Sequence, residues 1–338
     1  MKVMEIGADW DFEHIRLAER PDPRPGQGQV LLRMKAASLN YRDALMVRRG
    51  YGNQSGSLPL IPISDGVGEV IELGPGVDRV AVGQRVCPLM NQHWLHGPFR
   101  DGLWRGHLGG PLDGVMREFM VLDQEALVPV PDHLSDIEAA TLPCAGITAW
   151  SAIVEAGRIK AGDQVLVQGT GGVSLFALQF AKAQGATVIA TSSSEDKLAR
   201  LTELGADAVI NYRTTADWGK AAAKLTDGRG VDLVVETGGA QTIGQSIRAL
   251  RANGTIALVG NVTGSLAEIN LPHVFMKSAR LIGVVVGNRD AFEAMVRAIA
   301  QHQIAPVVDP KVYGFEELRA ALEALPLGRH IGKIALRF

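Results

Sequence analysis

The stretch that decides the fold runs Val165-Leu166-Val167-Gln168-Gly169-Thr170-Gly171-Gly172-Val173-Ser174. A short apolar strand without polar alternation leads straight into a helical pattern, as in a sheet that is covered on both faces. Glycines at such a turn let an anion approach the backbone, and the helix N-terminus then presents free amides to it. The stretch therefore predicts a βα turn that binds the pyrophosphate of a dinucleotide. Its contact residues would be Gly169, Thr170, Gly171, Gly172 and Val173.

One position departs from the usual glycine pattern. Ser174 stands where a third glycine commonly packs the helix against the strand, so we expect slightly wider packing there. A purely structural turn is the alternative interpretation, because a glycine pattern alone is weak support for a binding site.

The chain on both sides of this turn alternates between strand-like and helix-like segments. Helices are expected at about residues 175–183 and 195–204, and Gly205 would end the second. Six strands are predicted, at residues 164–168, 186–190, 208–210, 232–236, 255–259 and 281–286. This alternation predicts an α/β fold with a doubly wound parallel sheet. The chain would close with helices near 291–301 and 315–325 and a strand at 333–336.

Residues 1 to about 125 show a different pattern, which is rich in strand-like segments. Apolar segments at 29–37, 67–73 and 83–89 are separated by clusters of Gly and Pro at 21–26 and 74–76. Short strands at this spacing predict a barrel-like or sandwich-like domain.

Composition and charge exclude several classes of protein. The chain has 338 residues, 46% of them apolar and 21% charged, which is typical of a globular protein. A net charge of −2 leaves no basic footprint for nucleic acid or an anionic membrane. Without a recognisable leader or a long apolar run, we expect a cytoplasmic protein. Two cysteines, Cys87 and Cys144, are too few for a disulfide framework or a four-cysteine zinc site.

The end of the second predicted strand indicates which dinucleotide binds. An NAD site usually has Asp or Glu here, bonded to the ribose 2′-hydroxyl. This chain instead has hydroxyls at Ser192 and Ser193, with Lys197 and Tyr212 following. Hydroxyls and a cation suit a 2′-phosphate, so we predict NADPH as the cofactor. In the alternative interpretation, Ser192 and Glu195 form a capping box and Lys197 is merely solvated.

Several motifs together resemble those of the medium-chain dehydrogenase/reductase family, over essentially the whole chain. Besides the glycine turn they are Ser38-Leu-Asn-Tyr-Arg-Asp43, Pro62-Ile-Ser-Asp-Gly-Val-Gly68, Leu73-Gly-Pro-Gly-Val-Asp78, Gly83-Gln-Arg-Val86, Leu142-Pro-Cys-Ala-Gly-Ile-Thr148 and Gly283-Val-Val-Val-Gly-Asn-Arg289. The resemblance implies a chaperonin-10-like β-barrel catalytic domain over 1–145, completed by 288–338. It implies a Rossmann domain over 146–287, and a cleft between the domains that holds nicotinamide and substrate.

The family includes zinc-dependent alcohol dehydrogenases and zinc-free reductases that resemble quinone oxidoreductases. In the zinc enzymes, two barrel positions and one position near the domain junction carry Cys or His ligands. The matching residues here are Asn40, Ser64 and Cys144, and Asp65 stands where zinc enzymes often carry glutamate. An amide, a hydroxyl and a single thiol make a poor zinc site. We therefore expect no metal and a quinone oxidoreductase-like member.

The segment between Val86 and Glu118 is as long as the loop that bears the zinc lobe in relatives. It contains His93, His96 and His107, so a substitute metal site is one interpretation. Because the loop borders the substrate cleft in relatives, we expect instead that His93 and Trp94 line the substrate pocket.

Other site residues follow from the resemblance by position. Asn40 and Thr148 would lie beside the nicotinamide, although Asn40 could simply cap the helix that starts at Tyr41, and Thr148 could be an ordinary core residue. Tyr41 is the candidate hydroxyl facing the substrate, with packing at the helix start as its alternative role. Tyr41 and Asn40 are thus the catalytic candidates. The residues expected to border the nicotinamide ring are Val259, Gly260, Val285, Val286 and Gly287.

The expected activity is NADPH-dependent reduction of a small molecule: a quinone or an activated C=C or carbonyl compound. A conjugated acceptor spreads the charge that a metal would otherwise stabilise, so it suits a site without zinc. The alternatives are a zinc-free alcohol or aldehyde dehydrogenase and an NADPH-binding sensor with little turnover. The resemblance also implies a homodimer formed through the strand at 281–286.

Overall fold

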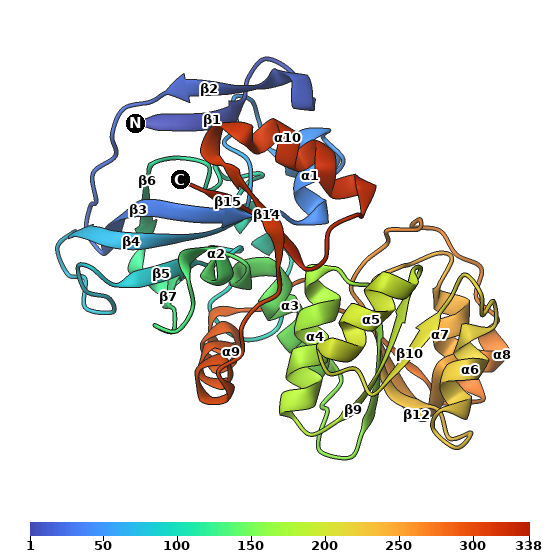
Figure 1. Ribbon diagram of the computed structural model, residues 1–338. Helices are drawn as coiled ribbons and strands as arrows, with labels where there is room; N and C mark the ends of the chain where they lie inside the picture. The colour runs from blue at the N-terminus through green and yellow to red at the C-terminus, as the bar shows by residue number, and fades with distance from the viewer. The chain divides into compact units, whose positions relative to one another are not determined.

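The computed structural model describes residues 1–338 and consists of two compact units (Figure 1). The first unit comprises Met1–Ile147 and Gly287–Phe338, and the second comprises Thr148–Val286. The chain therefore leaves the first unit once and returns to it. None of the helices combines the length and the apolar character that crossing a membrane requires.

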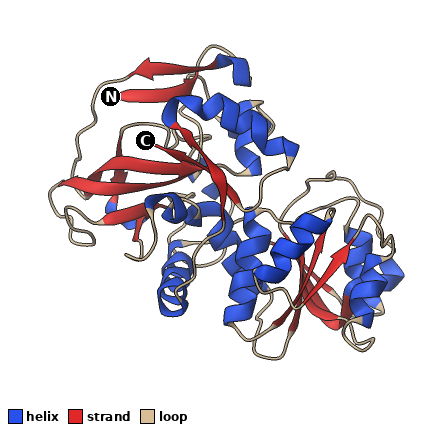
Figure 2. Ribbon diagram, viewed as in Figure 1, coloured by secondary structure: helices blue, strands red, loops and turns tan.

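The second unit is built on a six-stranded parallel sheet (Figure 2). Its strands are β8 (Gln164–Gln168), β9 (Thr187–Ser192), β10 (Ala208–Asn211), β11 (Val231–Glu236), β12 (Leu250–Leu258) and β13 (Arg280–Gly283). The spatial order is β10-β9-β8-β11-β12-β13, so the chain reverses its direction of travel between β8 and β11. This confirms the predicted doubly wound sheet, because all neighbouring strands are parallel.

The helices of the second unit are α4 (Gly172–Ala183), α5 (Glu195–Glu203), α6 (Trp218–Lys224), α7 (Ile243–Ala249) and α8 (Leu271–Phe275). α4 packs against β8 and β9, and α7 packs against β11 and β12. The interior strands are buried on both faces, which explains why they read as continuous apolar runs. The last strand is shorter than predicted, since β13 ends at Gly283 rather than at residue 286.

The first unit contains a seven-stranded sheet and a separate pair of strands. The sheet holds β3 (Gln29–Ser38), β4 (Asp65–Leu73), β5 (Arg85–Pro88), β6 (Phe119–Asp123), β7 (Leu127–Pro129), β14 (Val308–Gly314) and β15 (Lys333–Arg337). Its order is β14-β15-β3-β4-β5-β7, with β6 also paired to β3. The separate pair is β1 (Lys2–Ile6) with β2 (Ile15–Glu19), which the sequence analysis did not predict.

Helices of the first unit flank this sheet. They are α1 (Tyr41–Val47), α2 (Asp136–Ala139), α9 (Arg289–His302) and α10 (Leu318–Ala324), and α3 (Ile147–Trp150) lies at the boundary between the units. A π-helical segment, Leu142–Gly146, carries Cys144. The predicted helix at 315–325 is thus a short 3₁₀ turn followed by α10.

The strand register around Ser38 positions the site in the first unit. Ser38, the last residue of β3, pairs with Asp65 on one side and with Ala335 on the other. Both neighbours are antiparallel to β3, so β4 and β15 begin where β3 ends. Residues at these three chain positions, far apart in the sequence, therefore meet at one end of the sheet.

Candidate functional site

The glycine turn of the second unit has the geometry that anion binding requires. Gly169 adopts φ +75°, a left-handed conformation that favours glycine, and its N–H donates to the Thr191 carbonyl at 2.7 Å. Open space lies where a Cβ atom would stand at Gly169 and at Gly171. This room lets a ligand come close to the backbone.

Helix α4 begins at Gly172, three residues before the predicted start. The first turn of a helix has no intrahelical partners for its N–H groups, and no side chain caps α4. The amides of Gly172, Val173 and Ser174 therefore form a free donor set at the positive end of the helix dipole. These residues fit the pyrophosphate of a dinucleotide.

Ser174 has a defined role at the position of the missing third glycine. Its side chain is buried, and its Oγ donates to the Gln168 carbonyl at 2.6 Å. The hydroxyl thus ties the first turn of α4 to the end of β8, and its polar group is satisfied.

A buried carboxylate that the sequence analysis missed holds the neighbouring strand end. Glu236, the last residue of β11, accepts from the Gly238 and Gly239 N–H groups, each at 2.9 Å. It also accepts from Gln168 Nε2 at 2.9 Å and from the Thr242 and Ser246 hydroxyls. This network links the ends of β8 and β11, where the strand order reverses. The only sequence signal was an acidic residue at the end of an apolar run.

The residues predicted to read the 2′-phosphate lie at adjacent strand ends. Ser192 pairs with Asn211 in the β9–β10 register, and the Tyr212 N–H donates to the Ser192 carbonyl at 3.1 Å. Tyr212 is exposed, whereas Ser192 is buried and Ser193 and Lys197 are half-buried. Desolvation lowers the pKa of the Lys197 ammonium. The structure thus brings these predicted residues to one edge of the second unit.

The alternative capping box at Ser192 and Glu195 is wrong. The N-cap residue of α5 is Ser194, and β9 continues through Ser192. The Glu195 carboxylate instead accepts a hydrogen bond from Asn211 Nδ2.

The residues predicted to border the nicotinamide ring differ in exposure. The Val259 and Gly260 N–H groups donate to the Glu236 carbonyl at 2.9 and 3.1 Å, which fixes this segment after β12. Val285 is exposed and Val286 is buried, and both lie beyond β13, just before Gly287 begins the return to the first unit. Thr148 is buried on α3.

In the first unit, the residues at the family's zinc positions form a buried polar cluster with a lysine. The Lys333 ammonium donates to Asn40 Oδ1 at 2.5 Å and to the Leu39 carbonyl. Ser64 Oγ donates to Asp65 Oδ1 at 2.6 Å, and the Cys144 N–H donates to Asp65 Oδ2 at 3.0 Å. The cluster is built at the end of β3, where β4 and β15 begin.

This cluster does not fit a zinc ion. Asn40 Oδ1 and the Ser64 hydroxyl are both committed to partners within the protein. Desolvation, together with the nearby Asp65 carboxylate, raises the pKa of the Cys144 thiol to about 12. Cys144 is the only soft ligand among the three matched positions, and one thiol beside an amide and a hydroxyl makes a poor zinc site. Across residues 1–338, no three His, Cys, Asp or Glu side chains converge as a metal ion would require.

Two carboxyls in the cluster are buried. Burial raises the pKa of Asp43 to about 6, opposed mainly by Arg42, and raises the pKa of Asp65, opposed mainly by Lys333. Asp43 Oδ2 accepts from the Asn40 backbone N–H at 2.8 Å, with Asn40 at the N-cap position of α1. Asn40 thus stands at the N-cap position, but its side chain makes no cap hydrogen bond and accepts from Lys333 instead.

Helix α1 also presents the other catalytic candidate. Tyr41 is 41% exposed at the first position of the helix, so its ring is not core packing. The next residue, Arg42, donates to the carbonyls of Leu108 and Gly110 at 3.1 and 3.3 Å. Arg42 therefore docks the long loop onto α1.

The loop between β5 and β6 is held together by aromatic rings. Trp94, Phe99, Trp104 and His107 form a chain of edge-to-face contacts with centroids 5.0 to 5.1 Å apart. Trp94 Nε1 donates to the Gly97 carbonyl at 2.9 Å. His93 is exposed and Trp94 is half-buried within this loop. The indole thus has a structural role that the sequence analysis did not foresee.

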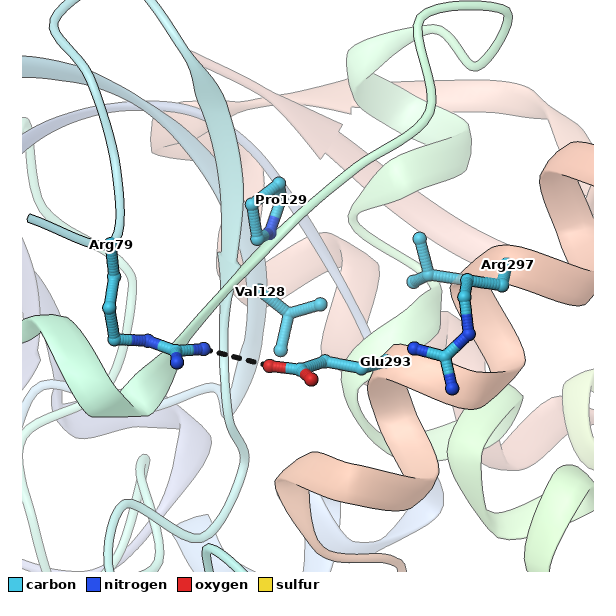
Figure 3. Close-up of a pocket in the computed structure, with 6 residues that line it drawn as sticks. Arg79, Val128, Pro129, Glu293 and Arg297 are labelled. Carbon is cyan, nitrogen blue, oxygen red and sulfur yellow. Dashed lines mark hydrogen bonds and ion pairs between the residues drawn. The ribbon is translucent and has the colours of Figure 1, made fainter.

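A shallow pocket of about 380 Å³ lies in the first unit between β7 and α9 (Figure 3). It is lined by Arg79, Val128, Pro129, Glu293, Val296 and Arg297, and Arg79 donates to Glu293 at 2.8 Å. It contains none of the predicted catalytic or cofactor residues, so we do not assign the active site to it.

Comparison with known proteins identifies the family. The family description "Alcohol dehydrogenase GroES-like domain" matches residues 26–132, and "Zinc-binding dehydrogenase" matches residues 172–301. A zinc-type alcohol dehydrogenase-like protein of Schizosaccharomyces pombe is 40% identical over 333 residues, covering 96% of each chain. The chain is a medium-chain dehydrogenase/reductase. The predicted family and its pairing of a barrel domain with a Rossmann domain are thereby confirmed.

Two further proteins are similar to the chain over nearly its whole length. An acryloyl-coenzyme A reductase of Sulfurisphaera tokodaii is 30% identical over 335 residues, covering 95% of this chain and 96% of the relative. The crystal structure of a putative alcohol dehydrogenase from Sinorhizobium meliloti 1021 is 40% identical, with a TM-score of 0.93, covering 100% of this chain and 98% of that one. This medium-chain dehydrogenase/reductase is therefore an oxidoreductase of a family that binds a nicotinamide cofactor.

Proposed function

We propose that the protein uses NADPH to reduce a C=C bond conjugated to a carbonyl group, as in an enone, a quinone or an enoyl thioester. The observation that carries this proposal is the residue set at the family's zinc positions. Asn40 and Ser64 replace ligands that a catalytic zinc needs, and their oxygens are already engaged by the protein. A conjugated acceptor needs hydrogen bonds rather than a Lewis acid, because its charge spreads over several atoms.

A nicotinamide held by the glycine turn would supply the hydride that the β-carbon of the acceptor receives. In an enone or an enoyl thioester the C=C π bond breaks, the carbonyl oxygen takes the negative charge, and a proton from solvent at the α-carbon completes the saturated product. In a quinone the same hydride and proton give the hydroquinone. In our proposal, Asn40 and Tyr41 offer hydrogen bonds to the acceptor, and His93 and Trp94 shape the entrance of its pocket. The acryloyl-coenzyme A reductase relative supports a conjugated thioester within this class.

The strand ends of the second unit support a preference for NADPH. The residues at the end of β9 are Ser192 and Ser193 rather than an Asp or Glu that would bond a ribose 2′-hydroxyl. The Glu195 carboxylate nearby accepts a hydrogen bond from Asn211. Lys197 and Tyr212 add a cation and an exposed hydroxyl at the same edge. The nicotinamide would lie against Thr148 and the segments 259–260 and 285–287.

The test measures cofactor oxidation by the purified protein with parallel panels of quinones, enones and enoyl-CoA thioesters, with NADPH and NADH. We expect turnover with at least one conjugated panel, faster with NADPH, and unchanged after dialysis against a zinc chelator. Ser193→Asp should reverse the cofactor preference by charge repulsion, whereas Ser193→Asn should not. NAD-linked alcohol oxidation that disappears with zinc would contradict the proposal. Tight NADPH binding without turnover would favour the sensor alternative.

We also propose a homodimer formed through β13. This strand pairs only with β12, so one edge of the six-stranded sheet is open. Exposed apolar side chains gather in the sequence just before and after it, at Leu266, Leu271, Phe275, Met276 and Val285. An open strand edge beside exposed apolar side chains is a common site of association between copies.

A further inference from the structure

The buried lysine at the start of β15 donates a hydrogen bond to Asn40, one of the residues matched to zinc ligands of relatives. We propose that Lys333 positions and polarises the Asn40 carboxamide, whose Nδ2–H group hydrogen-bonds the carbonyl oxygen of the acceptor. This inference rests on the proposed function and deepens it, because it assigns the group that replaces a Lewis acid. Lys333 acts through Asn40 and is a positioning residue.

The orientation of the Asn40 amide follows from the chemistry of its partner. An ammonium group has three donors and no acceptor, so the Asn40 atom that faces it must be the oxygen. The 2.5 Å contact between Lys333 Nζ and Asn40 Oδ1 therefore settles which way the carboxamide points. Nδ2 is turned away from Lys333 as a consequence.

Nδ2 is the donor left over by this arrangement. Nδ2 is buried and carries two N–H donors. One of them faces the Asp65 carboxylate, and this side-chain contact from Asn40 lowers the pKa of Asp65. The other N–H has no partner within the chain. A buried donor without a partner is costly, and such groups are often kept for a ligand. A carbonyl oxygen is the complementary acceptor.

The lysine also changes the strength of that donor. A cation bonded to the oxygen of an amide draws electron density from the nitrogen, and hydrogen bonds in such a chain strengthen one another. The polarised N–H group then stabilises the negative charge that appears on the acceptor oxygen during hydride transfer.

Lys333 is firmly held in the position that this role requires. Lys333 is 3% exposed, and the Leu39 carbonyl accepts a second hydrogen bond from its ammonium group. The Asp43 and Asp65 carboxylates lie close enough to interact with its charge. A purely structural lysine that only neutralises Asp65 is the competing explanation, and the test must separate the two.

Removal of Lys333 alone leaves a buried carboxylate without a cation and endangers folding. The decisive variant is therefore K333M/D65N, which removes both charges, and its matched control is D65N, which keeps Lys333. We expect K333M/D65N to lose about 10- to 100-fold in kcat relative to D65N. Its dissociation constant for NADPH should stay within about twofold, because cofactor binding does not need the polarised amide.

A mutant cycle with Asn40 tests whether the lysine acts through the amide. If it does, N40A/K333M/D65N should be no slower than N40A/D65N, since the lysine then has nothing to position. Equal kcat values for D65N and K333M/D65N would overturn the inference. Additive losses from N40A and K333M would overturn it as well, because they place the lysine outside the Asn40 route.

Failure of the proposed function remains distinguishable from failure of this inference. If the native protein reduces none of the conjugated acceptors, the proposed function is rejected. Crystal structures of D65N and K333M/D65N then still show whether Lys333 orients the Asn40 carboxamide. We expect the Asn40 carboxamide to rotate only in K333M/D65N. An unchanged carboxamide in that variant would overturn the positioning role whatever the substrate is.

Discussion

His107 is the residue whose burial has the clearest consequence for stability. It is 4% exposed, its Nε2 is buried without a partner, and its ring meets Trp104 edge to face at 5.1 Å. Burial, with a contribution from Arg42, lowers the pKa of the imidazole to about 3. The folded protein therefore holds His107 neutral where the unfolded chain would protonate it.

The stability that neutral His107 contributes is present above its unfolded pKa of about 6.5 and is lost as the pH falls toward 3. Between pH 7 and pH 5 the loss should be about 2 kcal/mol. In His107→Phe this loss should vanish, because the ring contact with Trp104 stays and the titrating group is gone. The measurement is the free energy of unfolding in urea at both pH values, compared between the two proteins. The prediction would be contradicted if the two proteins differed in unfolding free energy by the same amount at both pH values. The raised pKa of Asp43 makes an opposite contribution to the pH dependence of stability, and the comparison cancels it because both proteins contain Asp43.

Residues with a role in the site were not equally visible in the sequence. The glycines of the turn are recognisable because they follow a strand and precede a helix within a few residues. Lys333 was read only as part of a closing strand, since it lies 293 residues from Asn40 and no local pattern links them. Glu236 was likewise read as the end of a strand, because neither its burial nor its bond from the distant Gln168 leaves a local pattern.

Among the elements, helix α9 depends on the long loop for its N-terminus. The Arg289 N–H donates to the Trp94 carbonyl at 3.1 Å and the Asp290 N–H to the Leu95 carbonyl at 3.3 Å. Asn288 Oδ1 accepts from the Ala291 N–H at 2.9 Å, and its Nδ2 donates to the Gly97 carbonyl at 3.1 Å. One residue thus both caps the helix and binds the loop to it.

Asn288→Ala should therefore lower the opening free energy of α9 by about 1 kcal/mol, the usual value of an N-cap. Asn288→Asp is the matched control, because it keeps the capping oxygen and favours the helix dipole while it loses the donor to Gly97. Amide hydrogen exchange over 289–293 reports both effects. Equal exchange in Asn288→Ala and the native protein would rule out the capping role.

The success of element prediction followed the strength of local patterns. The six strands of the second unit were found because buried parallel strands are uninterrupted apolar runs. β14 was missed because Pro310 breaks its pattern, yet a proline is tolerated there since β14 is an edge strand. β2 was missed because most of its side chains are partly or fully exposed, which leaves little alternation to detect.

At the scale of the whole molecule, the proposed homodimer makes a direct prediction. Light scattering should give twice the chain mass of 36.1 kDa. Met276→Glu should shift the protein toward the monomer, because Met276 is 78% exposed next to β13 and a buried charge there would be unpaired. Leu327→Glu, at a similarly exposed position of the first unit, should leave the dimer intact. A monomeric native protein would refute the proposal.

The sequence by itself determined the family, the doubly wound sheet and the residues of the glycine turn. These rest on contacts between near neighbours in the chain, and the hydrophobic period and the glycines record such contacts directly. Only the tertiary structure decided what surrounds the zinc positions. Strand pairing on both sides of Ser38 brings Asp65 and the start of β15 together, so that Lys333 meets Asn40 from 293 residues away. The Cys144 N–H joins Asp65 from 79 residues away. A single sequence carries no trace of that pairing, because the partners of a β-strand end are set by sheet order rather than by local pattern.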